Sequence, residues 1–201
     1  MKRLSALFVA FCLSACVGGN GNTVPAATYD FGLPAAQVAA GGGWYGLALE
    51  VKQPEWLDST NIDYRLAYVD PLTRRHYAGS RWAGAPAQLI AQRLRQQLGA
   101  ISPTANAATD CLLRIELQEF SQVFDSPGAS RGVLVASVGL IDAKRKILAE
   151  RRFTVAKPAA SADAYGGVQA LVAATTELGA GLSDWLDGLE KSGSIKSCRP
   201  A

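Results

Sequence analysis

Apolar and polar residues alternate along several short stretches of the chain, with the period of two that is typical of half-buried β-strands. In one of them Leu113 and Ile115 alternate with polar residues, but the phase has changed by Phe120, which predicts a bulge or bend in a long strand. The predicted strands cover residues 47–51, 64–68, 76–83, 113–124, 133–142 and 147–156. The last three follow one another across short turns, so we expect an antiparallel meander.

Two other stretches have the three-to-four-residue spacing of amphipathic helices. The first starts at Pro86, where proline can begin a helix, and stops at Gly99; Arg93 and other polar residues occupy its second face. The second begins near Asp163, with Ser161 as the candidate N-cap. Its apolar stripe consists of Val168, Leu171, Thr175, Leu178, Leu182, Trp185 and Leu189.

The order of these elements predicts an α+β fold of two layers. Strands are followed by a helix in the first half of the chain and again in the second half, so we expect a mainly antiparallel sheet covered on one face by two amphipathic helices. A coiled coil is an alternative for the second helix, although Gly179 and Gly181 interrupt its heptads. Residues 191–201 are predicted to be a polar C-terminal tail.

Residues 1–15 have the composition of a bacterial export signal. Lys2 and Arg3 precede an apolar run that is too short to span a bilayer. The following tetrapeptide, Leu-Ser-Ala-Cys ending at Cys16, resembles the processing box of bacterial lipoproteins, in which the cysteine is acylated and becomes the new N-terminus. An ordinary secretory signal with a chance cysteine is the alternative.

An acylated Cys16 would anchor the protein to a membrane through a short tether. Residues 16–27 are small, polar and glycine-rich, so they predict a flexible segment that keeps the folded domain close to the bilayer. Val17 follows the cysteine, where inner-membrane lipoproteins commonly have aspartate. Resemblance to that sorting rule favours the periplasmic face of the outer membrane.

The charge balance excludes one class of partner. Without residues 1–15 the chain has 18 basic and 17 acidic residues, because the 20 and 17 of the full sequence lose Lys2 and Arg3. No basic block is long enough to indicate nucleic-acid binding. We therefore expect no nucleic-acid partner.

The cysteines predict one disulfide bond. Cys12 is removed with the signal and Cys16 is acylated, which leaves Cys111 and Cys198 in an oxidising compartment. A bond between them would tie the C-terminus to the sheet. Two unpaired thiols are the alternative.

The sequence shows no pattern of catalytic or metal-ligating residues. His76 is the only histidine, it lies beside two arginines on a predicted strand, and no nucleophile motif accompanies it. The carboxylates are scattered singly over turns and strands, and no cysteine and histidine spacing fits a metal. We expect neither an enzyme nor a bound metal or cofactor.

Aromatic residues near turns are the candidates for contact with a partner protein. Trp56, Trp82 and Phe124 occupy such positions, and Arg81 adjoins one of them. Aromatic side chains and arginine dominate the energetics of protein interfaces, so we predict that these residues bind a partner. Burial in the core is the alternative.

Five segments in fixed order carry a resemblance to a known family. They are YRLAY, YAGSRWAGAP, QLIAQRLRQQL, LRIELQEFSQVFD and ADAYGGVQAL. Together they resemble the auxiliary lipoprotein component of ABC-type transporters, including the lipoprotein of the paraquat-inducible set, over residues 29–189. The resemblance places a first strand at residues 29–33 and the domain at residues 28–190.

The resemblance implies a non-enzymatic subunit of a lipid transport system. Such lipoproteins work with a permease, an ATPase and a substrate-binding protein of the mammalian-cell-entry type, and help lipid pass between the inner and outer membranes. A homo-oligomer is also compatible with it. The alternative function is a stand-alone periplasmic protein that binds a lipid or small ligand in a cavity between helix and sheet.

Overall fold

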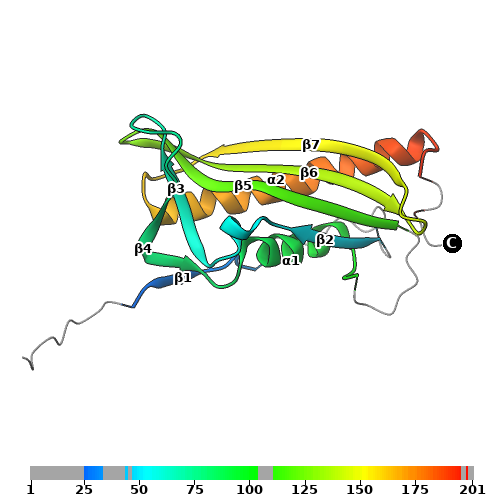
Figure 1. Cartoon of the computed structure of the whole chain (residues 1–201), viewed down its shortest axis with the longest axis horizontal. Coiled ribbons are helices and arrows are strands. Elements are labelled where there is room, and N and C mark those ends of the chain that lie inside the picture. Colours follow the sequence, from blue (N-terminus) through cyan, green and yellow to red (C-terminus); the bar gives the residue numbers. More distant parts are fainter. Residues whose placement is uncertain (1–24, 34–43, 45–46, 104–110, 196–197, 199–201) are drawn as a thin grey trace, which may run out of the picture.

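The computed structural model describes residues 25–33, 44, 47–103, 111–195 and 198 (Figure 1). Cys16, the predicted export signal and most of the predicted tether lie outside the described residues. The strands are β1 (Ala27–Tyr29), β2 (Ala48–Lys52), β3 (Asn61–Leu66), β4 (Arg75–Trp82), β5 (Cys111–Ser126), β6 (Ala129–Asp142) and β7 (Ile147–Pro158). The helices are α1 (Pro86–Leu98), α2 (Ala164–Lys191) and the 3-10 turn η1 (Glu55–Leu57).

The seven strands form one mixed sheet, so the expectation of a mainly antiparallel sheet needs correction. Its order is β1-β4-β3-β5-β6-β7, and β2 pairs with the first part of β5. The pairs β3–β4, β5–β6 and β6–β7 are antiparallel, but β1–β4, β2–β5 and β3–β5 are parallel. Between β3 and β5 the chain passes through β4 and α1, and such a long crossover lets it re-enter the sheet in the same direction.

A bulge in β5 keeps both halves of this long strand on the core. Leu117 lies opposite Ala136, but Glu119 lies opposite Val135, so Gln118 is the extra residue. The buried positions therefore change from odd numbers before the bulge to even numbers such as Phe120 after it. This confirms the bulge that the change of phase predicted.

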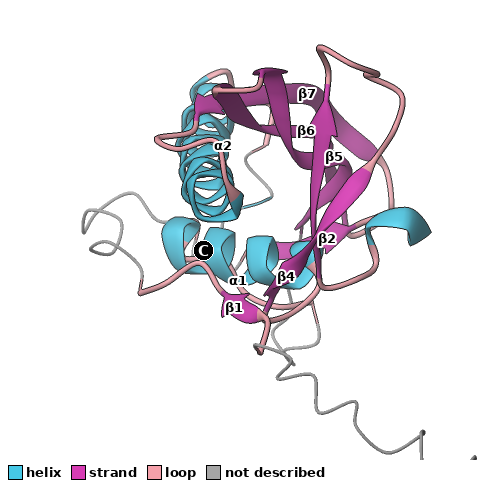
Figure 2. Ribbon diagram, turned by 90° about the vertical axis from the view of Figure 1, so that its left-hand side faces the viewer, coloured by secondary structure: helices cyan, strands magenta, loops and turns pink. Residues whose placement is uncertain are grey.

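Both helices cover the same face of the curved sheet, as predicted (Figure 2). Most of the α2 stripe is buried against β5, β6 and β7, while α1 packs against α2 and β2. Leu171, Leu178 and Leu182 have no exposed surface, and Leu94 of α1 joins the same core. The apolar stripe of α2 therefore packs on the sheet and forms one layer of the core. The coiled-coil alternative for this helix was wrong.

Helix α1 has the predicted ends but a different polar face. It begins at Pro86 and ends at Gly99, whose φ of 70° is the left-handed conformation that glycine adopts without strain. Arg93, expected on the second face, is buried and donates hydrogen bonds to the carbonyls of Phe31 and Gly32. Its guanidinium thus fixes the segment after β1 onto the helix.

The N-cap of α2 is Asp163, which corrects the prediction of Ser161. The Asp163 carboxylate accepts 2.8 Å hydrogen bonds from the Gly166 amide and from the Ser161 hydroxyl. These bonds, the Gly166 amide first, lower the pKa of Asp163. Aspartate caps better here because its oxygen reaches the amide three residues ahead, while Ser161 supports that oxygen.

The glycine pair in AYGGVQAL allows the start of α2 to lie close to the sheet. A Cβ atom at Gly167 would fall 2.1 Å from Oε1 of Gln122 on β5. Gln122 is fully buried, accepts a 2.8 Å hydrogen bond from the Tyr77 hydroxyl and donates a 2.7 Å bond to Ser130. Burial raises the pKa of Tyr77 to about 12, so its hydroxyl stays a donor. This polar group links β4, β5 and β6 beneath the helix.

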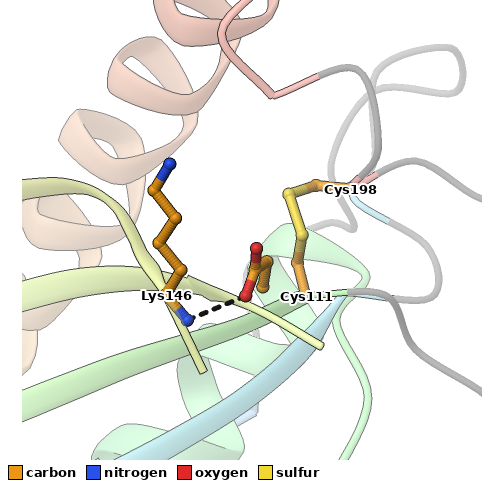
Figure 3. Close-up of a disulfide and its surroundings, with 4 residues drawn as sticks. Cys111, Lys146 and Cys198 are labelled. Carbon is orange, nitrogen blue, oxygen red and sulfur yellow. Dashed lines mark hydrogen bonds between the residues drawn. A yellow bond between two sulfur atoms is a disulfide. The ribbon is translucent and has the colours of Figure 1, made fainter. Parts of the chain in front are cut away.

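The chain after α2 folds back onto the core instead of forming only a polar tail. Gly193 has a φ of 78°, which reverses the chain, and Ile195 is 1% exposed. Cys198 then forms a disulfide with Cys111, the first residue of β5, with the two Cα atoms 5.1 Å apart (Figure 3). The bond ties the C-terminal segment to the sheet.

Candidate partner-binding surface

The face of the sheet opposite the helices carries a regular array of charged side chains, which we call the outer face. It is formed by side chains that alternate with core residues such as Leu113, Ile115 and Val138. Its residues are Glu50 and Lys52 of β2, Arg114 and Glu116 of β5, Ser137 and Gly139 of β6, and Glu150 and Arg152 of β7.

Strand register places these residues in two rows. One row runs across the strands through Glu50, Arg114, Gly139 and Glu150. The other, two residues along each strand, runs through Lys52, Glu116, Ser137 and Arg152. Charged side chains that are neighbours in these rows, or along a strand, therefore have opposite signs. The outer face as a whole is neither positively nor negatively charged.

A hollow of about 440 Å³ lies over the middle of the outer face. It forms because Ser137 and Gly139 of β6 are short, while charged side chains stand on the strands to either side. Even a Cβ atom at Gly139 would meet nothing nearer than Cγ of Glu150, at 4.0 Å. The floor of the hollow is thus open to a side chain or an extended backbone of a partner.

The ion pairs of the outer face are partly exposed. Nε of Arg114 lies 2.6 Å from Oε1 of Glu50, with 36% and 25% of the two side chains exposed. Pairs of this kind stabilise a fold by no more than about 1 kcal/mol, because water screens them. Their charges can exchange partners on binding at little cost.

Trp56 borders a second hollow beside the first. It lies in η1, it is 66% exposed, and the hollow of about 320 Å³ that it lines also includes Pro54 and Gln118. Glu116 lines both hollows. An exposed tryptophan at the rim of a hollow is a typical anchor for a protein partner.

The other three predicted contact residues do not join Trp56. Arg81 is exposed on β4, where its Nε donates to Thr28 at 3.3 Å, and it lines neither hollow. Trp82 and Phe124 are buried at 1% and 7% exposure, so their assignment to the surface was wrong. Their ring contacts are those of core residues: Trp82 packs on Phe31 and Phe120.

The charged rows near Trp56 were not predicted from the sequence. Their members were visible as the polar half of each alternating stretch, as in Arg114 and Glu116. The small outward residues Ser137 and Gly139 between apolar neighbours were the signal of a hollow. Only strand register shows that these positions lie side by side.

A second charged group lies beside the bulge of β5, at Glu119, and connects it to β3 and to the residue that precedes β4. Glu119 binds Arg65 at 3.0 Å and Arg74 at 2.9 Å, and Arg74 also binds Asp63 at 2.9 Å. Burial raises the pKa of Asp63, while the bond to Arg74 opposes that rise. His76 lies exposed on β4 opposite Asp63. The ion pairs join β3 and β5 to the residue before β4, and we call their four members, Asp63, Arg65, Arg74 and Glu119, the arginine cluster.

Two further findings concern metals and membranes. Among the residues that the structure describes, no group of three or more histidine, cysteine, aspartate and glutamate side chains is placed to hold a metal ion. Neither α1 nor α2, nor η1, has the length and hydropathy of a membrane-spanning helix.

The comparisons with known proteins identify the family. The model of the ABC-type transport auxiliary lipoprotein component family matches residues 29–183, which is well over half of the chain. The chain belongs to this family. The match covers the strands from Tyr29 onward and α1, and it ends within α2, so Cys198 lies beyond the matched residues while its disulfide partner Cys111 lies within them.

Solved structures of two proteins share the fold. A protein from Xanthomonas campestris, assigned to the family model DUF330, has a TM-score of 0.66 and 18% identity; the match covers 83% of this chain and 99% of that one. An uncharacterized protein has a TM-score of 0.63 and 13% identity, with coverage of 81% and 99%. No curated protein sequence matches this chain. Both solved structures therefore share the two-layer α+β fold of this chain.

Proposed function

We propose that the protein is a non-enzymatic auxiliary subunit of a mammalian-cell-entry type lipid transport system, anchored through acylated Cys16 to the periplasmic face of the outer membrane. The observation that carries the proposal is the family match over residues 29–183. The lipoprotein processing box at Cys16 and Val17 after it support the anchor and its location.

The outer face is the surface that we assign to the protein partner. Its alternating charges complement an extended segment whose own charges alternate, and the hollow over Gly139 admits that segment's side chains. Trp56 supplies the apolar anchor at one side. The partner in this proposal is the mammalian-cell-entry substrate-binding protein, which brings the permease and the ATPase with it.

Affinity capture from detergent extracts tests both the system and the surface. The wild-type protein should recover the mammalian-cell-entry protein together with its permease and ATPase. Trp56→Ala should weaken this interaction about 30-fold, since the loss of an interface anchor costs about 2 kcal/mol. Tyr165→Ala, which removes an exposed aromatic residue from α2, should bind like wild type.

Capture that recovers no transport protein would contradict the proposed system. Normal capture by Trp56→Ala would leave the system intact and rule out Trp56 as an anchor. The two results therefore test different parts of the proposal.

Replacing Cys16 with serine should abolish acylation. The thiol is the acceptor of the diacylglyceryl group, so the variant should remain unlabelled by a fatty-acid analogue and should keep its signal peptide from cleavage by the lipoprotein pathway. Metabolic labelling and gel mobility measure these effects. Cys12→Ser is the matched control and should be labelled normally. Persistent labelling of Cys16→Ser would show that a different residue is acylated.

A further inference from the structure

Residues 67–73, within the connection between β3 and β4, expose three large apolar side chains. We call these residues the hairpin tip. Leu72 is 87% exposed, Val69 63% and Tyr68 45%. Such a cluster on a protruding loop is unfavourable in water and indicates contact with another apolar surface.

Polar contacts hold the hairpin tip in shape, and the apolar side chains take no part in these contacts. The guanidinium of Arg65 donates to the carbonyls of Pro71 and Leu72, at 3.3 and 3.2 Å. The carboxylate of Asp70 accepts a 2.9 Å bond from the Leu72 amide and also binds the Thr73 hydroxyl. The backbone and charged groups are thus turned inward, which directs Leu72 and Val69 to the outside.

The arginine cluster gives the hairpin tip a rigid and electrically balanced base. Arg65 and Arg74 carry two positive charges, and Asp63 and Glu119 carry two negative charges. Contacts within 3.0 Å neutralise these four charges among themselves. The base therefore adds no net charge that would oppose the approach of the tip to a lipid surface.

The hairpin tip lies at the same end of the molecule as the start of β1. Figure 1 shows the β3–β4 connection, the start of α2 and the start of β1 at the same end of the long axis, with the β6–β7 turn at the other end. Eleven residue steps separate Cys16 from Ala27, which reach at most about 40 Å. A bilayer that holds Cys16 therefore lies within reach of this end of the domain.

We propose that the hairpin tip is a second membrane contact, which places Leu72 and Val69 at the acyl boundary of the bilayer that holds the Cys16 lipid. Tyr68 lies at headgroup depth, where aromatic rings with a polar group are favoured. Two contacts on one end would orient the long axis away from the membrane and keep the outer face free for its partner. The inference rests on the proposed anchoring through Cys16.

Fluorescence of the full-length acylated protein in lipid vesicles tests this contact. Leu72→Cys is labelled with an environment-sensitive dye, without reductant so that Cys111 and Cys198 stay bonded, in vesicles of phosphatidylethanolamine and phosphatidylglycerol. The dye should show blue-shifted emission and at least threefold stronger quenching by nitroxide acyl chains than a dye at Lys144→Cys. Lys144 is exposed on the β6–β7 turn at the opposite end, which makes it the matched control.

Each of the other outcomes overturns a specific part of the proposal, either the tip contact or the anchor. Equal, weak quenching at both sites on protein that floats with the vesicles overturns the tip contact and leaves the anchor standing. Protein that does not float with the vesicles overturns the anchor and the tip contact together. A dye at Leu72→Cys that is shielded in cell envelopes but not in pure lipid assigns the tip to a protein partner and overturns the lipid contact.

Discussion

Removal of the Cys111–Cys198 disulfide should lower the free energy of unfolding by about 4 to 5 kcal/mol while leaving a folded domain. The bond closes a loop over a sequence separation of 87 residues. In the chain-entropy model, opening a loop of that length raises the conformational entropy of the unfolded chain and so lowers its free energy by about this amount. Among the described residues of the core, only Ile195 and Cys198 belong to the segment after α2, so the two helices and the sheet should keep the rest of their core.

In the folded state, removal of the bond should loosen only the C-terminal segment. Ile195 and Cys198 are buried only because the C-terminal segment folds back from Gly193 onto the start of β5. Without the bond, this segment gains little from staying ordered, so its amides should exchange faster than those of Leu171 in α2.

Urea unfolding of the double variant Cys111→Ser, Cys198→Ser measures the effect. The midpoint should fall, and the slope with urea should rise, because the unfolded chain exposes more surface without the cross-link. Wild-type protein in reductant should match the variant. Equal midpoints with and without reductant would contradict a stabilising role, and two alkylatable thiols in unreduced protein from the periplasm would show that the bond does not form.

Replacing Gly132 with valine should destabilise the protein by at least about 3 kcal/mol. Gly132 lies on the core face of β6, directly beneath the backbone of α2. A Cβ atom there would lie 2.7 Å from the carbonyl carbon of Ala170 and 2.7 Å from the amide nitrogen of Leu171. Backbone cannot rotate out of the way as a side chain can, so α2 would have to lift from the sheet.

Gly139→Val is the matched control on the same strand. Gly139 lies on the outer face, where the nearest atom to an added Cβ is 4.0 Å away. Both variants gain the same strand propensity from valine. The difference between their free energies of unfolding therefore measures the collision with the helix. Thermal or urea unfolding should show a loss of stability for Gly132→Val and no loss for Gly139→Val. Equal stabilities would mean that α2 can move outward at no cost.

The sequence by itself determined the local elements of this protein. Alternation revealed the long strands and even the change of phase at the bulge, because side chains on a strand point to opposite faces in turn. Pro86 and Gly99 marked the ends of α1, since each suits one helix terminus. Elimination of Cys12 and Cys16 left one pairing, Cys111 with Cys198, which the structure contains.

Tertiary structure alone decided which elements are neighbours. Alternation is the same in parallel and antiparallel strands, so the parallel pairing of β3 with β5 depends on the path through β4 and α1. An aromatic residue near a turn can be buried or exposed, and packing placed Trp82 in the core and Trp56 at the surface. The outer face exists only through register across β2, β5, β6 and β7, because residues far apart in the sequence become neighbours by backbone pairing.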